Sequence, residues 1–437
     1  MRFRILALCV LFLLPLAVFA QSAQSAQDDR VGQLEQEVAK LKAEIAAMKN
    51  EGAGDDRVTE LERRLDLIAA EIERLKIGQA ASISGSADES EHGLGPAASK
   101  IYRAERGISI GGYGELLYQS PEDGEAEFDL LRAVLYFGYK FDDRWLFNSE
   151  IEYEHAGEEV GVEFAYLDYL WRPQANVRAG LLLVPMGFIN ELHEPTTFLG
   201  ANRPISERII IPTTWRENGF GLFGEAGPLS YRTYIVAGLD ASGFTAGGIR
   251  GGRQEGIESS AEDFAWVGRL DYNGLPGLLV GGSAYVGDSG QGSDLGVGTR
   301  ILEGHLEWKW KGLELRALAV QAELDDVAEL NRELDLRGNQ SVGERLTGQY
   351  LQAGYDVLAG RGGDQAFIPF GRWETYNTQD EVPRGFAADP ANDVEVLTLG
   401  FSYKPIDQIV VKVDHQSFDN EAGTGTDQFN VLLGWIF

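Results

Sequence analysis

Residues 429–437 read Phe-Asn-Val-Leu-Leu-Gly-Trp-Ile-Phe. Because successive side chains of a β-strand point to opposite faces, the odd-numbered residues form one apolar face that ends in aromatic side chains. Such a face is typical of the lipid-facing last strand of an outer-membrane barrel, although a buried strand can show the same pattern. We expect Trp435 and the terminal Phe437 to form the signal that barrel-assembly machinery recognises.

The same alternation runs from about residue 107 to residue 437. A soluble β-sandwich also alternates, so the connections decide between the two folds. Short connections alternate with long polar ones, as do the periplasmic turns and extracellular loops of barrels. Examples of short ones are 142–144, 173–176 and 311–312, and of long ones 190–218, 240–263 and 324–344. The pattern predicts an all-β transmembrane barrel of about sixteen antiparallel strands with an aqueous lumen.

The N-terminus indicates the compartment. Arg2 and Arg4 precede an apolar run over residues 5–19, and the small residues that signal peptidase needs stand at 18 and 20. We expect residues 1–20 to be a cleaved signal peptide, because the run is too short to span a bilayer comfortably. The one cysteine, Cys9, would leave with it, so the mature protein would have no thiol chemistry.

Between the signal and the barrel the apolar period changes to that of a coiled coil. Apolar residues occupy a and d positions from Val31 to Met48 and again from Val58 to Leu75. We expect residues 21–77 to form a periplasmic coiled coil, with a parallel trimer favoured over an intrachain hairpin. Residues 78–106 are rich in Gly, Ala and Ser and are predicted to be a flexible linker before the barrel, residues 107–437.

Composition restricts the partners. The chain has 437 residues and a net charge of -30, which argues against nucleic acid because phosphate backbones call for basic surface. The charge says less about small anions, because the local field of a pore can differ from the sum over the protein.

One region resembles a known family. The stretch from Gly180 to Gly187 follows a Gly-x-x-x-x-Pro-x-Gly pattern, a long third loop follows at about 189–218, and residues 216–221 read Arg-Glu-Asn-Gly-Phe-Gly. With the coiled coil, these features resemble the phosphate-selective porin O and P family. The resemblance implies a homotrimeric channel in the outer membrane of a Gram-negative bacterium, in contact with lipid and lipopolysaccharide. It also implies a third loop that folds inward and narrows the channel.

Charged residues of the expected lumen supply the candidate site. Those expected at the constriction are Arg132, Arg178, Glu191, Glu194, Arg203, Glu207, Arg208 and Arg216. Those expected to line the lumen elsewhere are Lys140, Glu150, Glu152, Asp168, Arg172, Arg232, Arg269, Arg316 and Arg372. Basic and acidic residues nearly balance, whereas a strongly anion-selective pore needs a one-sided column of donors. We therefore expect passive diffusion of small hydrophilic solutes or ions with a modest anion preference, and keep a phosphate or oxyanion channel as the alternative.

Two other function classes remain: an envelope tether and a barrel enzyme. No Gly-x-Ser-x-Gly motif is present, so no catalytic residue is predicted and the chain is not expected to be an enzyme. The histidines lack metal-ligand spacing, so neither a metal nor a cofactor is expected. The glycine-rich stretch 247–253 resembles a phosphate cradle but has no helix after it, and it is interpreted as a flexible loop.

Overall fold

The structure is a computed structural model that describes residues 33–34, 36–49, 57–58, 60–65, 67–69, 90–104 and 106–437. It divides into two compact units, Met1–Ser82 and Ile83–Phe437. The predicted signal peptide lies outside the described residues, as do parts of the predicted coiled coil and linker. No helix among the described residues is long and apolar enough to cross a membrane.

The described residues of the first unit are helical. Leu41 and Val58, which stand at predicted core positions, are each 6% exposed. Lys49 pairs with Glu62 and Arg64 pairs with Glu37, both at 2.8 Å. These exposed ion pairs join the two helical stretches within one chain, as the hairpin alternative requires, but contribute little stability. The trimer stays a prediction.

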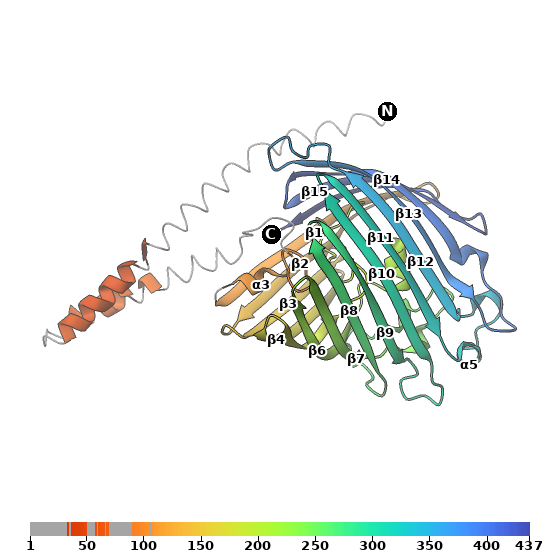
Figure 1. The fold of residues 1–437 in the computed structure, drawn as a ribbon, viewed down its shortest axis with the longest axis horizontal. Coiled ribbons are helices and arrows are strands. Elements are labelled where there is room, and N and C mark those ends of the chain that lie inside the picture. The colour runs from red at the N-terminus through yellow and green to blue at the C-terminus, as the bar shows by residue number, and fades with distance from the viewer. Residues whose placement is uncertain are drawn as a thin grey trace. The chain divides into compact units, whose positions relative to one another are not determined.

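The second unit is a closed barrel of sixteen antiparallel strands, which confirms the predicted fold class (Figure 1). Each strand pairs with its neighbours in sequence, and β1 pairs with β16 to close the ring. The strands are β1 (Gly107–Pro121), β2 (Glu127–Lys140), β3 (Trp145–Glu154), β4 (Glu159–Arg172), β5 (Ala175–Leu183), β6 (Arg216–Ala226), β7 (Leu229–Ala237), β8 (Phe264–Leu275), β9 (Leu278–Asp288), β10 (Gly298–Trp310), β11 (Leu313–Leu324), β12 (Arg345–Tyr355), β13 (Ala366–Glu381), β14 (Asp393–Ile406), β15 (Ile409–Asn420) and β16 (Gln428–Ile436). Short helices are α3 (Lys100–Arg103), α4 (Ile205–Ile210) and α5 (Val327–Glu333).

The two rims of the barrel differ in the length of their connections. On one rim, which also holds the start of β1 and the end of β16, most turns have two to four residues, as at 173–174, 227–228 and 311–312. We call it the short-turn rim and the opposite one the long-loop rim. The long-loop rim carries the longer connections, including 184–215, 238–263 and 325–344, although 122–126 and 155–158 are short. The predicted asymmetry between the rims is confirmed.

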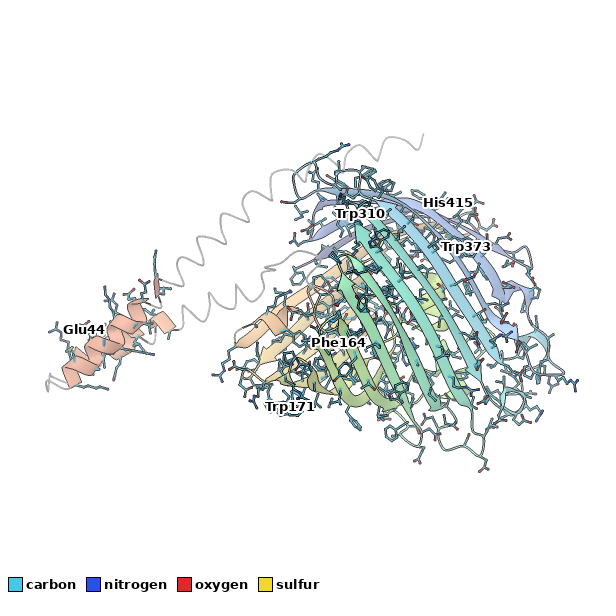
Figure 2. All side chains as sticks on the ribbon, in the orientation of Figure 1. Glu44, Phe164, Trp171, Trp310, Trp373 and His415 are labelled. Carbon is cyan, nitrogen blue, oxygen red and sulfur yellow. The ribbon has the colours of Figure 1, made fainter. Side chains whose placement is uncertain are left out.

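The outer wall is apolar. Trp171, Trp310 and Trp373 are 59%, 54% and 39% exposed on it, whereas Phe164 on the inner face of β4 is fully buried (Figure 2). In β16 the predicted alternation holds, because the side chains at 430, 432, 434 and 436 are buried and those at 429, 433 and 437 are exposed.

The barrel interior is more filled than an open aqueous lumen would be. Inward-facing apolar residues of the wall, the 184–215 connection and residues 90–104 form one buried hydrophobic cluster. Residues 90–104 were predicted to lie in a flexible linker, and for them that prediction is wrong. Leu94 and Ile101 are each 1% exposed there. Their small neighbours, which suggested a linker, instead allow close packing against the wall.

Candidate functional site

The connection between β5 and β6, residues 184–215, is the third loop, and it folds into the barrel as the resemblance implied. Asn190 links the two ends of this loop by hydrogen bonds. The Asn190 amide donates to the carbonyls of Val184 at 2.6 Å and Trp215 at 2.8 Å, and its oxygen accepts from the Trp215 N–H at 2.5 Å. The Trp215 ring packs 4.8 Å from that of Tyr285 on β9. The loop therefore begins a few residues earlier than predicted and returns to the wall at β6.

Glu207 holds the loop in its folded shape. One of its carboxylate oxygens accepts from the backbone N–H groups of Phe188 and Ile189, both at 2.8 Å. The other accepts from the Tyr350 hydroxyl of β12 at 2.8 Å. A Cβ at Gly187, whose φ is +64°, would lie 2.4 Å from the Glu207 carboxylate, so this position needs glycine. Glu207 was predicted at the constriction, but it is fully buried and supports the loop.

The far wall of the barrel binds the loop through its backbone. The Glu374 carboxylate on β13 accepts from the N–H groups of Ile205 at 2.8 Å and Ser206 at 3.2 Å. Arg372 donates to Glu374 at 2.7 Å and to the Leu199 carbonyl at 3.2 Å. Three more wall residues contact the loop backbone: Arg316, Lys404 and Asp414. The third loop thus crosses the whole lumen.

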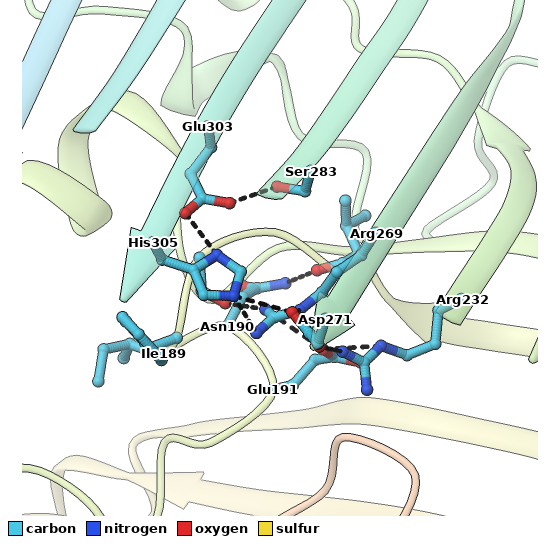
Figure 3. A network of polar contacts seen from close by, with 12 residues as sticks. Ile189, Asn190, Glu191, Arg232, Arg269, Asp271, Ser283, Glu303 and His305 are labelled. Atoms are coloured by element: carbon cyan, nitrogen blue, oxygen red, sulfur yellow. Dashed lines mark hydrogen bonds and ion pairs between the residues drawn. The ribbon is translucent and has the colours of Figure 1, made fainter. Parts of the chain in front are cut away.

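A buried network joins the loop to β7 and β8 (Figure 3). Glu191 lies 3.4 Å from Arg232 and 3.8 Å from Arg269. Both guanidiniums also pair with Asp271, at 2.6 and 2.9 Å. The network continues through His305, Glu303 and Ser283. The predicted lumen cations Arg232 and Arg269 are therefore neutralised by buried carboxylates.

Two further residues of the third loop contact β3 and residues 90–104, on the side of the loop that faces the short-turn rim. The His193 ring lies 3.2 Å from the Glu150 carboxylate of β3. Glu194 accepts from the backbone N–H groups of Ala97 at 3.1 Å and Ala98 at 3.0 Å. Burial raises the pKa of Glu194 to about 7, against the opposing effect of these two donors.

A cavity of about 950 Å³ lies on the other side of the third loop, toward the long-loop rim. We call it the outer vestibule. Its wall is formed mainly by β1 to β4, with single residues of β5, β6, β13 and β16 and two of β15, and its floor by the third loop and the connection between β7 and β8. Its charged lining includes Glu115, Glu152, Glu163, Arg132, Arg203, Arg208, Arg216, Arg250 and Arg253.

Half of these arginines are neutralised. Arg132 forms ion pairs with Glu115, Glu152 and Glu154 at 2.9, 2.9 and 3.0 Å. Arg216 pairs with Glu163 at 2.7 Å and with Glu255 at 3.0 Å, and Arg253 pairs with Glu255 at 2.8 Å. The carboxylates of the lining outnumber these three arginines, so this part of the vestibule has a negative formal charge; they are Glu115, Glu152, Glu154, Glu159, Glu163 and Glu255.

Arg203, Arg208 and Arg250 differ from the others, and we call them the arginine trio. None of them forms an ion pair with a carboxylate of the described residues. Arg203 donates to the His193 carbonyl at 3.2 Å, and Arg250 donates to the carbonyls of Arg208, at 3.4 Å, and Thr213. Burial and the neighbouring guanidiniums lower the pKa of Arg250 to about 9. The floor of the vestibule carries an excess of positive charge, and such a cluster can hold a small anion.

The predicted site residues thus fall into three groups. Arg132, Arg203, Arg208 and Arg216 line the vestibule, with Glu152 beside them. A second group faces inward and is paired or bound to backbone, and all its members are buried except the half-buried Lys140: Arg178, Glu191, Glu194, Glu207, Lys140, Glu150, Asp168, Arg232, Arg269, Arg316 and Arg372. Arg178 in particular pairs with Asp168 at 2.9 Å near the short-turn rim and does not line the vestibule.

Arg172 is the third case. It is exposed, and its guanidinium lies 4.5 Å from the Trp171 ring on the outer wall. The prediction that it lines the lumen is wrong, because Arg172 is the last residue of β4 and its exposed side chain contacts Trp171 instead.

Arg250 and Arg253 are the vestibule residues that the sequence analysis missed. They lie in the stretch 247–253, which was interpreted as a flexible loop. The stretch is instead docked into the barrel, because the Ala246 carbonyl accepts from Thr378 at 2.6 Å and from Asn392 at 3.2 Å. Two arginines among glycines were the signal available, but their partners are distant in sequence.

One group of possible metal ligands occurs among the described residues. Atoms of Glu122, His415 and Asp427 lie within 4.8 Å of one another on the long-loop rim. Asp427 already accepts hydrogen bonds from the Ser417 hydroxyl and the Phe418 N–H, both at 3.0 Å. Exposed acidic groups are common without an ion, so proximity alone does not make this group a metal site.

Comparisons place the fold among porin barrels. A deletion mutant of OmpT, an outer membrane protein of Vibrio cholerae, matches with a TM-score of 0.51 and 11% identity, covering 76% of this chain and all of that one. An anion-selective porin from Comamonas acidovorans matches with a TM-score of 0.50 and 12% identity, over 76% of this chain and all of that one. These identities are low, so the likeness concerns the fold alone.

No family model matches the chain. An uncharacterized protein of Aquifex aeolicus is 39% identical over 364 residues, which cover 79% of this chain and 83% of that protein. The chain therefore belongs to the same family as this Aquifex aeolicus protein, and its fold is a sixteen-strand porin-like barrel.

Proposed function

We propose that this protein is an outer-membrane channel for the passive diffusion of small hydrophilic solutes and ions, with a modest preference for anions. The observation that carries the proposal is the arginine trio. Arg203, Arg208 and Arg250 lie at the floor of a 950 Å³ vestibule without a carboxylate partner among the described residues.

The net charge of -30 does not oppose this preference. Selectivity at a narrow point is decided by the few charges closest to the ion, and distant charges are screened. The wall arginines Arg132 and Arg216 are matched by glutamates, so they add little to the field. The unmatched charge is concentrated where a solute entering from the long-loop rim first meets the third loop.

The outer wall supports the location in a membrane. Leu135, Leu167 and Phe220 are between 39% and 57% exposed on it, as a band in contact with hydrocarbon would be. Trp145, Trp308 and Trp310 lie toward the short-turn rim, where aromatic girdles meet the interface. The proposed partners are lipid, lipopolysaccharide and the barrel-assembly machinery. In this orientation the long-loop rim faces the cell exterior, and the helical unit lies in the periplasm. A homotrimer remains part of this proposal.

An oxyanion channel, as in the phosphate-selective porin O and P family, is the alternative. The arginine trio favours it, because guanidinium groups match the geometry of phosphate oxygens and can bind them in pairs. Three arginines from the third loop and its neighbour could then form a phosphate site. Arg132 in the same vestibule is paired with three glutamates, and this excess of negative charge opposes strong selection of phosphate.

The test is single-channel recording of the purified protein in a planar bilayer. We expect discrete conductance steps in potassium chloride and, in a salt gradient, a reversal potential of the sign that marks a slight anion preference. Micromolar phosphate should leave the chloride current unchanged if diffusion is passive, and should block it if the oxyanion alternative holds. Absence of conductance steps in a bilayer with inserted protein, both for the unchanged chain and after deletion of the buried residues 90–104, would reject both channel proposals.

A further inference from the structure

Residues 90–104 lie inside the short-turn end of the barrel, opposite the outer vestibule. We call them the inner segment. Leu94, Ala97 and Ile101 are each 1% exposed and belong to the same buried cluster as the third loop. The segment therefore occupies the part of the lumen through which a solute would leave.

The third loop and β3 bind the backbone of the inner segment. Glu194 accepts from the N–H groups of Ala97 and Ala98, and Asn148 donates to the Ala98 carbonyl at 3.0 Å. A Cβ at Gly95 would lie 2.5 Å from the Glu194 carboxylate, so the glycine lets this carboxylate approach. Backbone groups on both sides of the segment are thus paired inside the barrel.

A second set of contacts comes from the wall. The Tyr102 hydroxyl donates to Asp168 at 2.7 Å and accepts from Arg178 at 2.6 Å. Lys140 donates to the Ala104 carbonyl at 2.7 Å. Asp168 and Arg178 do not line the outer vestibule. Their ion pair instead binds the Tyr102 hydroxyl of the inner segment.

The wall is also shaped for the segment. Gly138 on the inner face of β2 has no side chain, and Ile101 fills the space. A Cβ built at Gly138 would lie 2.9 Å from the Ile101 Cγ1 and 3.0 Å from its Cβ. The neighbouring inward positions 134, 136 and 140 of β2 carry large side chains. The missing side chain and the bound isoleucine together form a socket.

We propose that the short-turn end of the barrel is a docking site for this chain's own residues 90–104, which act as a removable stopper of the channel. The docked segment closes the exit below the third loop, and its release opens it. The buried apolar side chains and the polar contacts above offset the entropy lost when fifteen residues are ordered, so weakening these contacts favours release. The covalent link to β1 keeps the released segment at high local concentration. This inference rests on the proposed channel function.

The main test locks the stopper in place by a disulfide. In the double variant Ile101→Cys and Gly138→Cys, the two Cβ atoms start 3.0 Å apart, and a shift of about 1 Å gives disulfide geometry. The mature protein is expected to have no other cysteine, because Cys9 lies in the predicted signal. The matched control is Ile101→Ser with Gly138→Ser, which has similar sterics but cannot crosslink. Gel mobility with and without dithiothreitol shows whether the bond has formed.

We expect the oxidised double variant to conduct several-fold less than the same protein after dithiothreitol, and the serine control not to respond to the reductant. Failure of the cysteines to crosslink in the folded protein would show that Ile101 does not sit at Gly138, and would overturn the docking. Equal conductance of the crosslinked and reduced forms would overturn the stopper while leaving the channel function intact.

Deletion of residues 90–104 from the full chain is the second variant. We expect several-fold higher conductance or longer openings than in the unchanged protein, with folding checked by heat-dependent gel mobility. Equal conductance of the deletion variant and the unchanged protein would again overturn the stopper. Absence of conductance in every protein tested, the deletion variant and the reduced double variant included, would reject the channel function and, with it, the stopper.

Discussion

The Tyr350 hydroxyl of β12 donates a 2.8 Å hydrogen bond to Glu207, the carboxylate around which the third loop folds. Both residues are buried, and Glu207 has no exposed surface. Replacing Tyr350 by Phe should leave one buried carboxylate oxygen without this donor, which typically costs about 1–3 kcal/mol. We expect the third loop to become more susceptible to proteolysis and the chemical unfolding midpoint of the barrel to fall.

Tyr355→Phe is the matched control, because Tyr355 lies on the same strand but is 50% exposed on the outer wall. Its unfolding midpoint and its third-loop cleavage should equal those of the unchanged protein. If Tyr350→Phe also behaves like the unchanged protein, Glu207 does not depend on this bond for its place under the vestibule.

The arginine trio should control selectivity. Changing Arg203, Arg208 and Arg250 together to Gln removes three positive charges from the vestibule floor. We expect the reversal potential in a potassium chloride gradient to shift toward cation preference, because the glutamates of the wall remain. The control changes Arg332, Arg337 and Arg384 to Gln, which removes the same charge from exposed positions on the long-loop rim. Equal shifts in the two variants would mean that total charge, and not the vestibule floor, sets selectivity.

The barrel was predictable from sequence because its main determinant is local. A strand between lipid and lumen must alternate, so Phe429, Leu433 and Phe437 could be assigned to the outer wall and Asn430 to the inside, as the structure confirms. The alternation of short and long connections then gave the strand number. Neither inference needs a contact between residues distant in sequence.

The site was less predictable, because alternation shows that a side chain points into the barrel but not which residues it contacts there. Arg178 and Arg132 show the same pattern in sequence, yet Arg178 is 3% exposed beside Tyr102, and Arg132 lines a cavity. The difference comes from residues 90–104, whose composition resembles a linker. Their burial depends on Gly138 and Glu194, which lie more than 30 positions away. Likewise, Arg250 joins the vestibule only because the loop that holds it docks into the barrel.

Phe437 should contribute to closing the barrel. Its N–H donates to the Gly112 carbonyl at 2.9 Å, and its carbonyl accepts from the Gly112 N–H at 3.0 Å, which extends the pairing of β16 with β1. Deletion of Phe437 removes both bonds and the aromatic end of the strand. We expect less folded protein in the outer membrane, measured by heat-dependent gel mobility, while export to the periplasm continues.

Trp435→Ala should have a smaller effect of the same kind. The indole lies over Gly114 of β1, where a Cβ would come within 2.2 Å of it. The control for both changes is Phe264→Ser, since Phe264 is 56% exposed at the long-loop end of β8, away from the closing seam. Normal folded levels after deletion of Phe437 would contradict its role as the assembly signal.

The helical unit gives a choice between two assemblies. A peptide covering residues 21–78 should sediment as a trimer if the a and d positions pack between chains, and as a monomer if they pack in a hairpin. The ion pairs from Glu37 to Arg64 and from Lys49 to Glu62 belong to the hairpin. Glu37→Arg should therefore lower the helicity of a hairpin slightly, and adding Arg64→Glu should restore it, because the pair is re-formed with reversed charges. Helicity that rises with peptide concentration, together with sedimentation at three times the monomer mass, would establish the trimer and exclude the hairpin.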